Sequence, residues 1–191
     1  MTPPIRHARP DEIPSVAALI AHAFNNLAQT HSLVPDTDHR LPVMTAYFEL
    51  AITTATIHVI PGPHDHPIAT SVWFDRTHPE PPNPTYDNHL ATITGPYLPN
   101  FQALDNLLAA HHPPEPHWHL AFLAVHPHHR HTGHGAALLA HTHTTLTTPA
   151  YLEATNEANI RLYRRHGYKT LHPFAIHLPD GTPFYRMWRR P

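Results

Sequence analysis

The sequence predicts a single mixed α/β domain, and three observations lead to that class. Apolar residues spaced by three and four positions, typical of helices, alternate along the chain with short runs typical of strands. The 191 residues are enough for one domain with a sizeable core and too few for two ordinary ones. The chain has no internal repeat and no linker long enough to separate domains, so we expect one domain over residues 1–191.

The first third of the chain is predicted to form a short strand and two helices. The strand is expected over residues 5–8. Asp11 is placed to cap the first helix, whose first turn tolerates Pro14 because the amide that proline lacks would be unpaired there. A second helix begins near residues 35–38. The inner face of the first helix is Ile13, Val16, Ala17, Ile20, Phe24 and Leu27, and that of the second is Leu41, Met44, Phe48, Ala51 and Ala55.

The middle of the chain is predicted to form a hairpin, a loop and a third helix. Residues 56–60 and 68–74 have strand composition and are joined by a segment rich in proline and glycine. Several prolines in residues 75–85 favour an ordered surface loop over a regular element. A helix is expected over residues 101–110.

The last third shows the clearest pattern. A near-continuous apolar run over residues 118–125 is typical of a central strand, and a helix opens at Gly135. Residues 156–166 are predicted to be helical, with Gly167 as the left-handed residue that ends the helix. The remaining strands are expected over residues 150–154, 168–178 and 184–189.

Composition and charge exclude several classes of protein. Hydrophobic residues make up 41% of the chain, as in globular proteins, and the formal net charge of −2 argues against a nucleic-acid partner. Without cysteine the chain cannot carry a disulfide, a thiolate metal site or a cysteine nucleophile. No apolar run is long enough to cross a bilayer, and the first residues lack the apolar core of a signal peptide. We therefore expect a cytoplasmic protein that binds neither nucleic acid nor membrane.

The chain is rich in histidine, with 23 residues. Histidine clusters at 64–66, 111–112 and 126–131 could capture a metal ion. A functional metal site needs convergent ligands held by their own hydrogen-bond partners, whereas these clusters are predicted in proline-rich turns. We expect solvated surface there and no metal site, and a histidine-rich metal buffer is the alternative.

A candidate phosphate site lies between the strand at 118–125 and the helix that follows it. There Arg130 precedes Gly133 and Gly135. A phosphate at a helix N-terminus meets unpaired amide N–H groups and the positive end of the helix dipole. Glycines at alternate positions let the backbone approach closely and aim successive amides at one anion. Taken alone, the same pattern would also suit a tight connection without a ligand.

Two signatures in the right order resemble the GNAT superfamily of acyltransferases. Leu123-Ala-Val125 followed by Arg130-His-Thr-Gly-His-Gly-Ala136 is similar to the family's Arg/Gln-x-x-Gly-x-Gly/Ala turn after a strand. Leu152-Glu-Ala-Thr-Asn156 and Ile160-Arg-Leu-Tyr163-Arg-Arg-His-Gly167-Tyr168 are similar to its second signature, a strand, an asparagine and then Leu-Tyr-x-x-x-Gly-Phe/Tyr. The resemblance implies a bent, mixed, mostly antiparallel sheet of six to seven strands flanked by four to five helices.

Over essentially the whole chain the pattern is closest to puromycin N-acetyltransferase and related actinobacterial enzymes. Glu115-Pro-His-Trp118 and the closing Met187-Trp-Arg-Arg-Pro191 carry this narrower likeness. It implies direct transfer of an acetyl group from acetyl-coenzyme A to a primary amine of a small molecule, such as an antibiotic or a metabolite. The acceptor itself does not follow, because acceptor-facing segments vary within the family.

The resemblance also implies how acetyl-coenzyme A is held. Main-chain groups of Ala124 and Val125 would pair with the pantetheine arm, and an N–H near Val125 could polarise the thioester carbonyl. Asn156 and Asn159 lie where relatives place a cofactor-contacting asparagine, and Asn156 also suits a helix N-cap. The residues of the phosphate turn are Arg130, His131, Thr132, Gly133, His134, Gly135 and Ala136.

The turn differs from its relatives in charge. Relatives often carry further arginine or lysine there, whereas this chain has His131, Thr132 and His134 and keeps Arg130 as the one permanent charge of the turn. We therefore expect affinity for coenzyme A to fall as pH rises through the histidine titration range.

Three residues are candidates for proton transfer. Tyr163 lies where the family keeps a tyrosine that protonates the departing thiolate, although a tyrosine packed in the core would fit the same position. Glu153 resembles the catalytic glutamate of ribosomal-protein N-terminal acetyltransferases, but the segment from there to Tyr163 is about two residues shorter. His119 is the competing base, since a neutral imidazole can accept a proton, and a water chain is the third possibility.

The acceptor site is expected between the two N-terminal helices, the segment 86–97 taken as a loop, and the last hairpin. Phe24, Tyr47 and Phe48 are its predicted wall. The chain is expected to act as a monomer or homodimer. The alternatives are a protein or peptide N-terminal acetyltransferase and a non-catalytic sensor that binds acyl-coenzyme A.

Overall fold

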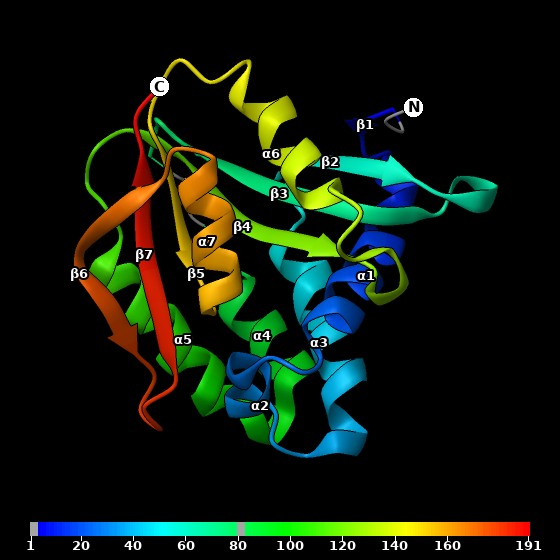
Figure 1. Cartoon of the computed structure of the whole chain (residues 1–191). Helices are drawn as coiled ribbons and strands as arrows, with labels where there is room; N and C mark the ends of the chain where they lie inside the picture. The colour runs from blue at the N-terminus through cyan, green and yellow to red at the C-terminus, as the bar shows by residue number, and fades with distance from the viewer. Residues whose placement is uncertain (1–3, 80–82) are drawn as a thin grey trace.

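The protein is described here from a computed structural model, which covers residues 4–79 and 83–191. Seven strands form one sheet in the order β1-β2-β3-β4-β5-β7-β6 (Figure 1). Every neighbouring pair is antiparallel except β4 and β5, which are parallel. The predicted mixed, mostly antiparallel sheet is confirmed. The strands are β1 Arg6–His7, β2 Thr56–Pro61, β3 Pro67–Arg76, β4 His117–Val125, β5 Ala150–Ala154, β6 Lys169–His177 and β7 Pro183–Arg189.

The described ranges contain seven α-helices, two more than the upper end of the expectation. The helices without a clear sequence signal are α2 and α4. The six residues of α2 bury Gln29 and Thr30 besides Leu33, so they show no apolar stripe. None of the helices is both long and apolar enough to cross a bilayer. The helices are α1 Ile13–Phe24, α2 Ala28–Leu33, α3 Thr37–Ala51, α4 Tyr86–Thr94, α5 Leu98–His111, α6 His134–His143 and α7 Glu157–Arg165.

Local chemistry explains where α3 begins and where α7 ends. Asp36 caps α3 by accepting a hydrogen bond from the Asp38 amide at 2.9 Å, and Gly167 follows α7 with φ of +88°. The prediction that Asp11 caps α1 is wrong. A 3-10 turn over Pro10–Glu12 leads directly into α1, and no side chain caps it.

The helices cover both faces of the sheet. Val72 and Trp73 are successive residues of β3 and therefore project to opposite faces. Val72 packs with α1, α3, α4 and α5, whereas Trp73 packs with α6 and α7. The result is a three-layer arrangement with the parallel pair β4–β5 at its centre (Figure 1). Residues 75–85, predicted as a loop, begin with the end of β3, and residues 80–82 lie outside the described part.

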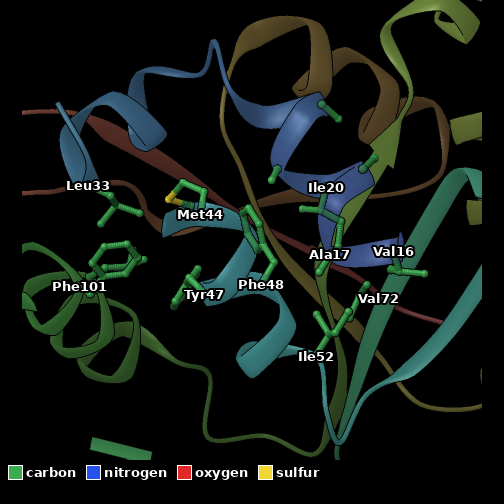
Figure 2. Close-up of a cluster of buried hydrophobic side chains, with 14 of the residues drawn as sticks. Val16, Ala17, Ile20, Leu33, Met44, Tyr47, Phe48, Ile52, Val72 and Phe101 are labelled. Carbon is green, nitrogen blue, oxygen red and sulfur yellow. The ribbon is translucent and has the colours of Figure 1, made fainter. Parts of the chain in front are cut away.

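The larger core fixes α1 and α3 on the sheet. In Figure 2 the side chains of Ile20 and Phe48 fill the space between these helices. Phe48 is 2% exposed and its ring lies 5.0 Å from that of Phe122 on β4. Phe24, at the end of α1, contacts the Phe48 ring edge-on at 5.8 Å. The three rings form an apolar wall beside the middle of β4.

Candidate active site

The sheet opens between β4 and β5. The two strands pair over only three positions, from Trp118 opposite Ala150 to Leu120 opposite Leu152. Beyond that point residues 121–125 of β4 have no partner on β5. The parallel pair therefore splays at the centre of the molecule.

A β-bulge in β4 lies at the start of this opening. Trp73 of β3 pairs with Leu120 and Val72 pairs with Phe122, so Ala121 is the extra residue. A bulge bends its strand and increases the local twist, which turns the rest of β4 away from β5. The sequence analysis did not anticipate the bulge, because an apolar run carries no signal of pairing register.

Two adjoining cavities occupy the opening. An inner cavity of about 130 Å³ lies on the side of the N-terminal helices, and an outer cavity of about 690 Å³ lies between β4, the start of α6 and α7. Five residues line both: Phe24, Leu27, Leu123, Asn159 and Tyr163. A ligand in the outer cavity can therefore reach groups that face the inner one.

The predicted phosphate turn lies at the outer cavity. His131 and Gly133 have φ of +64° and +86°, and Gly133 is the N-cap of α6. A side chain at Gly133 would be strained at that φ, which explains the glycine. Within the described chain no side chain caps α6, so the amides of its first turn are open to an anion.

Most of the predicted cofactor residues gather here. Arg130 bends back to donate a hydrogen bond from Nη2 to the Ala23 carbonyl at 2.6 Å, which joins the turn to the end of α1. Thr132 and His134 are in the turn but do not line the cavity. The predicted residues that line it are Ala124, Val125, Arg130, His131, Gly133, Gly135, Ala136, Asn156 and Asn159.

Two arginines at this cavity were missed from the sequence. Arg161 and Arg165 of α7 line it as well. Their spacing of four puts both on one face of the helix, and that spacing was the available signal. The outer cavity therefore has more permanent positive charge than Arg130 alone, so the expected pH dependence of anion binding would be weaker than the turn by itself suggests.

The predicted acceptor wall lies at the inner cavity. Phe24, Tyr47 and Phe48 all line it, and burial raises the pKa of Tyr47 above its ordinary value. The segment 86–97 does not line it and was wrongly taken as a loop, because residues 86–94 form α4. Gly95 and Pro96 follow the end of that helix. The last hairpin contributes Phe184.

The two candidate bases form one pair. His119 Nε2 lies 2.8 Å from Glu153 Oε2, and the side chains are 11% and 7% exposed. Burial opposes ionisation of Glu153, but the charge of His119 and the hydrogen bond from its ring outweigh it, so the pKa of Glu153 is lowered. The carboxylate is therefore ionised at neutral pH and accepts a hydrogen bond from the His119 ring. The Tyr151 hydroxyl also interacts with this buried carboxylate and helps to lower the pKa of Glu153.

His112 packs against this pair. The expectation that the 111–112 cluster is solvated surface is wrong for His112, whose ring contacts His117 at 4.8 Å, His119 at 5.4 Å and Tyr151 at 5.6 Å. Burial, with the neighbouring imidazoles, lowers its pKa to about 4. His112 is thus a neutral ring behind the base pair. Among the described residues no three histidine or acidic side chains are arranged to hold a metal ion.

Tyr163 connects the two cavities. It projects from α7, is 7% exposed and lines both cavities. Burial raises its pKa well above the ordinary value of a phenol, so the hydroxyl keeps its proton at neutral pH. A protonated phenol at this position can donate a proton to a group held between the cavities.

The asparagines at the start of α7 have structural partners. Asn156 Oδ1 accepts a hydrogen bond from the Asn159 amide at 3.0 Å, which confirms the predicted N-cap. Asn159 Nδ2 donates to Thr155 Oγ1 at 3.0 Å. Both side chains nevertheless line the outer cavity, so a structural and a binding role are compatible there.

Gln29 of α2 is a polar residue of the inner cavity that the sequence analysis did not identify. Its Nε2 donates to the Pro183 carbonyl at 2.6 Å and to the Thr155 carbonyl at 3.2 Å. The residue is 5% exposed, and its Oε1 is buried with no partner within the described chain. Nothing in the sequence around Gln29 separates it from a surface residue of a short helix.

Comparison with known proteins identifies the fold. The family model of the acetyltransferase (GNAT) domain matches residues 103–170, which include β4, the phosphate turn, β5 and α7. A solved acetyltransferase from Corynebacterium glutamicum, described as histone acetyltransferase HPA2 and related, is 29% identical over 100% of this chain and 97% of its own, with a TM-score of 0.76. The chain is a GNAT-fold acyltransferase.

Two further solved structures share the fold of this acyltransferase. An N-acetyltransferase from Staphylococcus aureus is 17% identical and has a TM-score of 0.62, with 97% of this chain and 99% of the other covered. The PaiA N-acetyltransferase from Thermoplasma acidophilum, solved in complex with coenzyme A, is 10% identical with a TM-score of 0.59 over both full lengths. At these identities they establish the architecture of the acyltransferase and not its acceptor.

Proposed function

We propose that this acyltransferase moves an acetyl group from acetyl-coenzyme A directly to a primary amine of a small molecule. The observation that carries the proposal is the position of Tyr163, which lines both cavities. The His119–Glu153 pair lies at the inner cavity, and the open N-terminus of α6 lies at the outer one. A proton donor, a proton acceptor and an anion site thus surround one opening in the sheet.

The outer cavity suits the donor. The amides of residues 131–136 would hold the pyrophosphate, with Arg161 and Arg165 adding positive charge. Ala124 and Val125, in the splayed part of β4, have main-chain groups that face no neighbouring strand on the β5 side and can pair with the pantetheine arm. Acetyl-coenzyme A supplies the acyl group as an activated thioester. Holding this thioester beside the amine makes the reaction effectively intramolecular.

The inner cavity suits the amine. An amine in water is mostly protonated and must lose a proton before it attacks. The His119–Glu153 pair accepts that proton through its buried carboxylate. The nitrogen then forms the new C–N bond as the C–S bond breaks. The Tyr163 hydroxyl gives its proton to the sulfur, and the second proton that the nitrogen loses restores the Tyr163 hydroxyl. No covalent enzyme intermediate is required.

The size of the inner cavity favours a small acceptor over a protein N-terminus. Its volume is about 130 Å³, and α1, α2, α3 and α5 all contribute to its wall. The resemblance to puromycin N-acetyltransferase makes an antibiotic amine one candidate within this class only where the antibiotic is small enough for this cavity. Retention of the acid and of the base pair favours an enzyme over a sensor that only binds acyl-coenzyme A.

The proposal is tested by thiol release from acetyl-coenzyme A with a panel of primary amines. We expect turnover with at least one small amine and a loss of about 10²- to 10⁴-fold in kcat for Tyr163→Phe. Tyr168→Phe is the matched control, because that hydroxyl bonds to His143 at 3.1 Å in the same core and lines neither cavity. Coenzyme A binding without any turnover would favour the sensor, and absence of binding would refute the proposal.

A further inference from the structure

We infer that the acceptor is a small apolar amine with one ammonium group and no other charge, of about the size of a single ring with a short chain. The inference rests on the proposed function, since it names the substrate of the same site. It is carried by the volume of the inner cavity, by the charged residues that line it and by a buried oxygen atom of Gln29 that lacks a partner within the described residues.

The volume limits the acceptor to about one ring. The inner cavity measures about 130 Å³. An apolar protein cavity of about 150 Å³ is known to bind one benzene molecule. An aminonucleoside or an aminoglycoside, with several rings, exceeds this space.

The lining makes the cavity a site for apolar groups. Aromatic rings of Phe24, Phe48, Phe122 and Phe184 face it, with leucines from α5. Aromatic walls favour a flat or branched hydrocarbon group and contribute by burial and by ring contacts. The body of the acceptor is therefore expected to be hydrocarbon.

The charged residues that line the cavity can neutralise only one positive charge on the acceptor. Glu153, paired with His119, is the one acidic residue among its lining residues, and no lysine or arginine lines it. A second ammonium or a carboxylate on the acceptor would be buried without a partner, which costs several kcal/mol in an apolar site. Polyamines, amino acids and aminoglycosides are thereby disfavoured.

Gln29 provides a second hydrogen-bond acceptor at the cavity, and the orientation of its amide group is fixed. Both hydrogens of its Nε2 are used by the carbonyls of Pro183 and Thr155. Exchanging N and O would turn the amide oxygen toward two carbonyl oxygens, so Oε1 is the atom left free. Oε1 of Gln29 is buried and lacks a partner in the described structure, whereas the Glu153 carboxylate also interacts with the Tyr151 hydroxyl. Both side chains line the inner cavity and are therefore the candidates for holding the ammonium group.

The first arm of the test compares acceptors on the intact enzyme. We expect 2-phenylethylamine and hexylamine to exceed spermidine, kanamycin, puromycin and a tetrapeptide by about 100-fold or more in kcat/KM. Efficient turnover of one of the large or multiply charged amines, with weak turnover of the small apolar ones, would overturn the inference and leave the transferase function intact. No turnover of any of them would overturn both.

The second arm changes the cavity volume. Leu108→Ala enlarges the inner cavity and should allow a two-ring amine such as 2-(naphthyl)ethylamine, whereas Ala121→Leu fills it and should abolish turnover of 2-phenylethylamine while coenzyme A still binds. Leu107→Ala is the matched control, because Leu107 is a partly buried residue of the same helix that does not line the cavity. An unchanged acceptor range in both cavity variants would contradict the assignment.

The third arm tests Gln29. Gln29→Leu should raise the KM for 2-phenylethylamine about tenfold or more, because a hydrogen bond to a charged group is lost. Ser32→Ala removes the other link between α2 and the β6–β7 hairpin, the 2.7 Å hydrogen bond between Ser32 and Thr182, without touching the cavity. Equal effects of the two changes on KM would show that Gln29 only tethers α2.

Discussion

His119 and Glu153 meet because of the register of β4 and β5. His119 lies opposite Tyr151, and Glu153 is two positions further along β5. Residues two apart on a strand project from the same face, so the imidazole and the carboxylate lie side by side. The proposed base is therefore a hydrogen-bonded pair of side chains, in which the carboxylate accepts the proton of the amine.

The first prediction at the residue scale concerns this pair. Glu153→Gln removes the carboxylate that accepts the proton from the amine, and we expect kcat/KM to fall by about 10²- to 10⁴-fold at pH 7.5. Steady-state thiol release measures this. Glu157→Gln, an exposed change at the start of α7, is the control. A fall of less than about tenfold would favour proton transfer through a water chain.

The second residue prediction concerns Tyr163 at alkaline pH. Its pKa is raised by burial, so the phenol keeps its proton above the pH at which an ordinary tyrosine loses it. We expect kcat with a fast amine to show no decline between pH 8 and pH 10 caused by loss of the acid. The measurement is kcat against pH for the wild type. A decline centred below pH 10 that disappears in Tyr163→Phe would contradict the prediction.

At the scale of elements, α7 combines a cap, a cation face and the proposed acid. Asn156 caps it, Arg161 and Arg165 line the outer cavity, and Tyr163 lines both cavities. Ile160 and Tyr163 are buried against β5 and β7 residues in the second core. Because α7 packs on the sheet through this buried face, the packing also fixes where Arg161, Arg165 and the Tyr163 hydroxyl lie.

The prediction for α7 separates two roles of Asn156, which are to cap the helix and to bind coenzyme A. Asn156→Ala should lower the free energy of unfolding by about 1 kcal/mol, because the amide of Asn159 loses its acceptor, whereas Asn156→Ser should retain most of the cap. Urea denaturation measures stability, and calorimetry with coenzyme A measures binding. If serine restores stability but not affinity, the Asn156 side chain contacts the donor. Restoration of both would assign it to the cap alone.

At the scale of the whole molecule, neutral histidines are buried or half-buried on both faces of the sheet. Burial, with other neighbouring charges, lowers the pKa of His58, His112 and His143 to about 4. His58 lies near α6 through its contact with Thr142, and His143 bonds to Tyr168. A histidine of the unfolded chain titrates near 6.5. Between about pH 6.5 and pH 4 the unfolded state therefore binds more protons than the folded state.

Stability should consequently fall as the solution is acidified through that window. Each such histidine contributes at most about 1.4 kcal/mol per pH unit to the slope. We predict that His58→Gln makes the free energy of unfolding less dependent on pH between 6.5 and 4.5, whereas the exposed change His177→Gln does not. Urea denaturation at four pH values provides the slopes. Equal slopes for the wild type and His58→Gln would refute this cause.

Much of the fold could be predicted because its signals are local. The apolar run at 118–125, the glycines of the phosphate turn and the cap at Asn156 each act within a few residues, and each proved correct in position. Helix α2 and the buried ring of His112 were missed, because polar residues become buried only through partners distant in sequence.

By itself, the sequence determined the class of the domain, the order of its strands and of five of its helices along the chain, and the turn that opens α6, since these depend on periodicity and on backbone conformation. Only the tertiary structure decided that His119 and Glu153 form one pair, that β4 bulges at Ala121, and that Gln29 is buried at a cavity of about 130 Å³. The physical reason is register: which residues of separate strands and helices meet depends on how the whole core packs, and no local pattern specifies it.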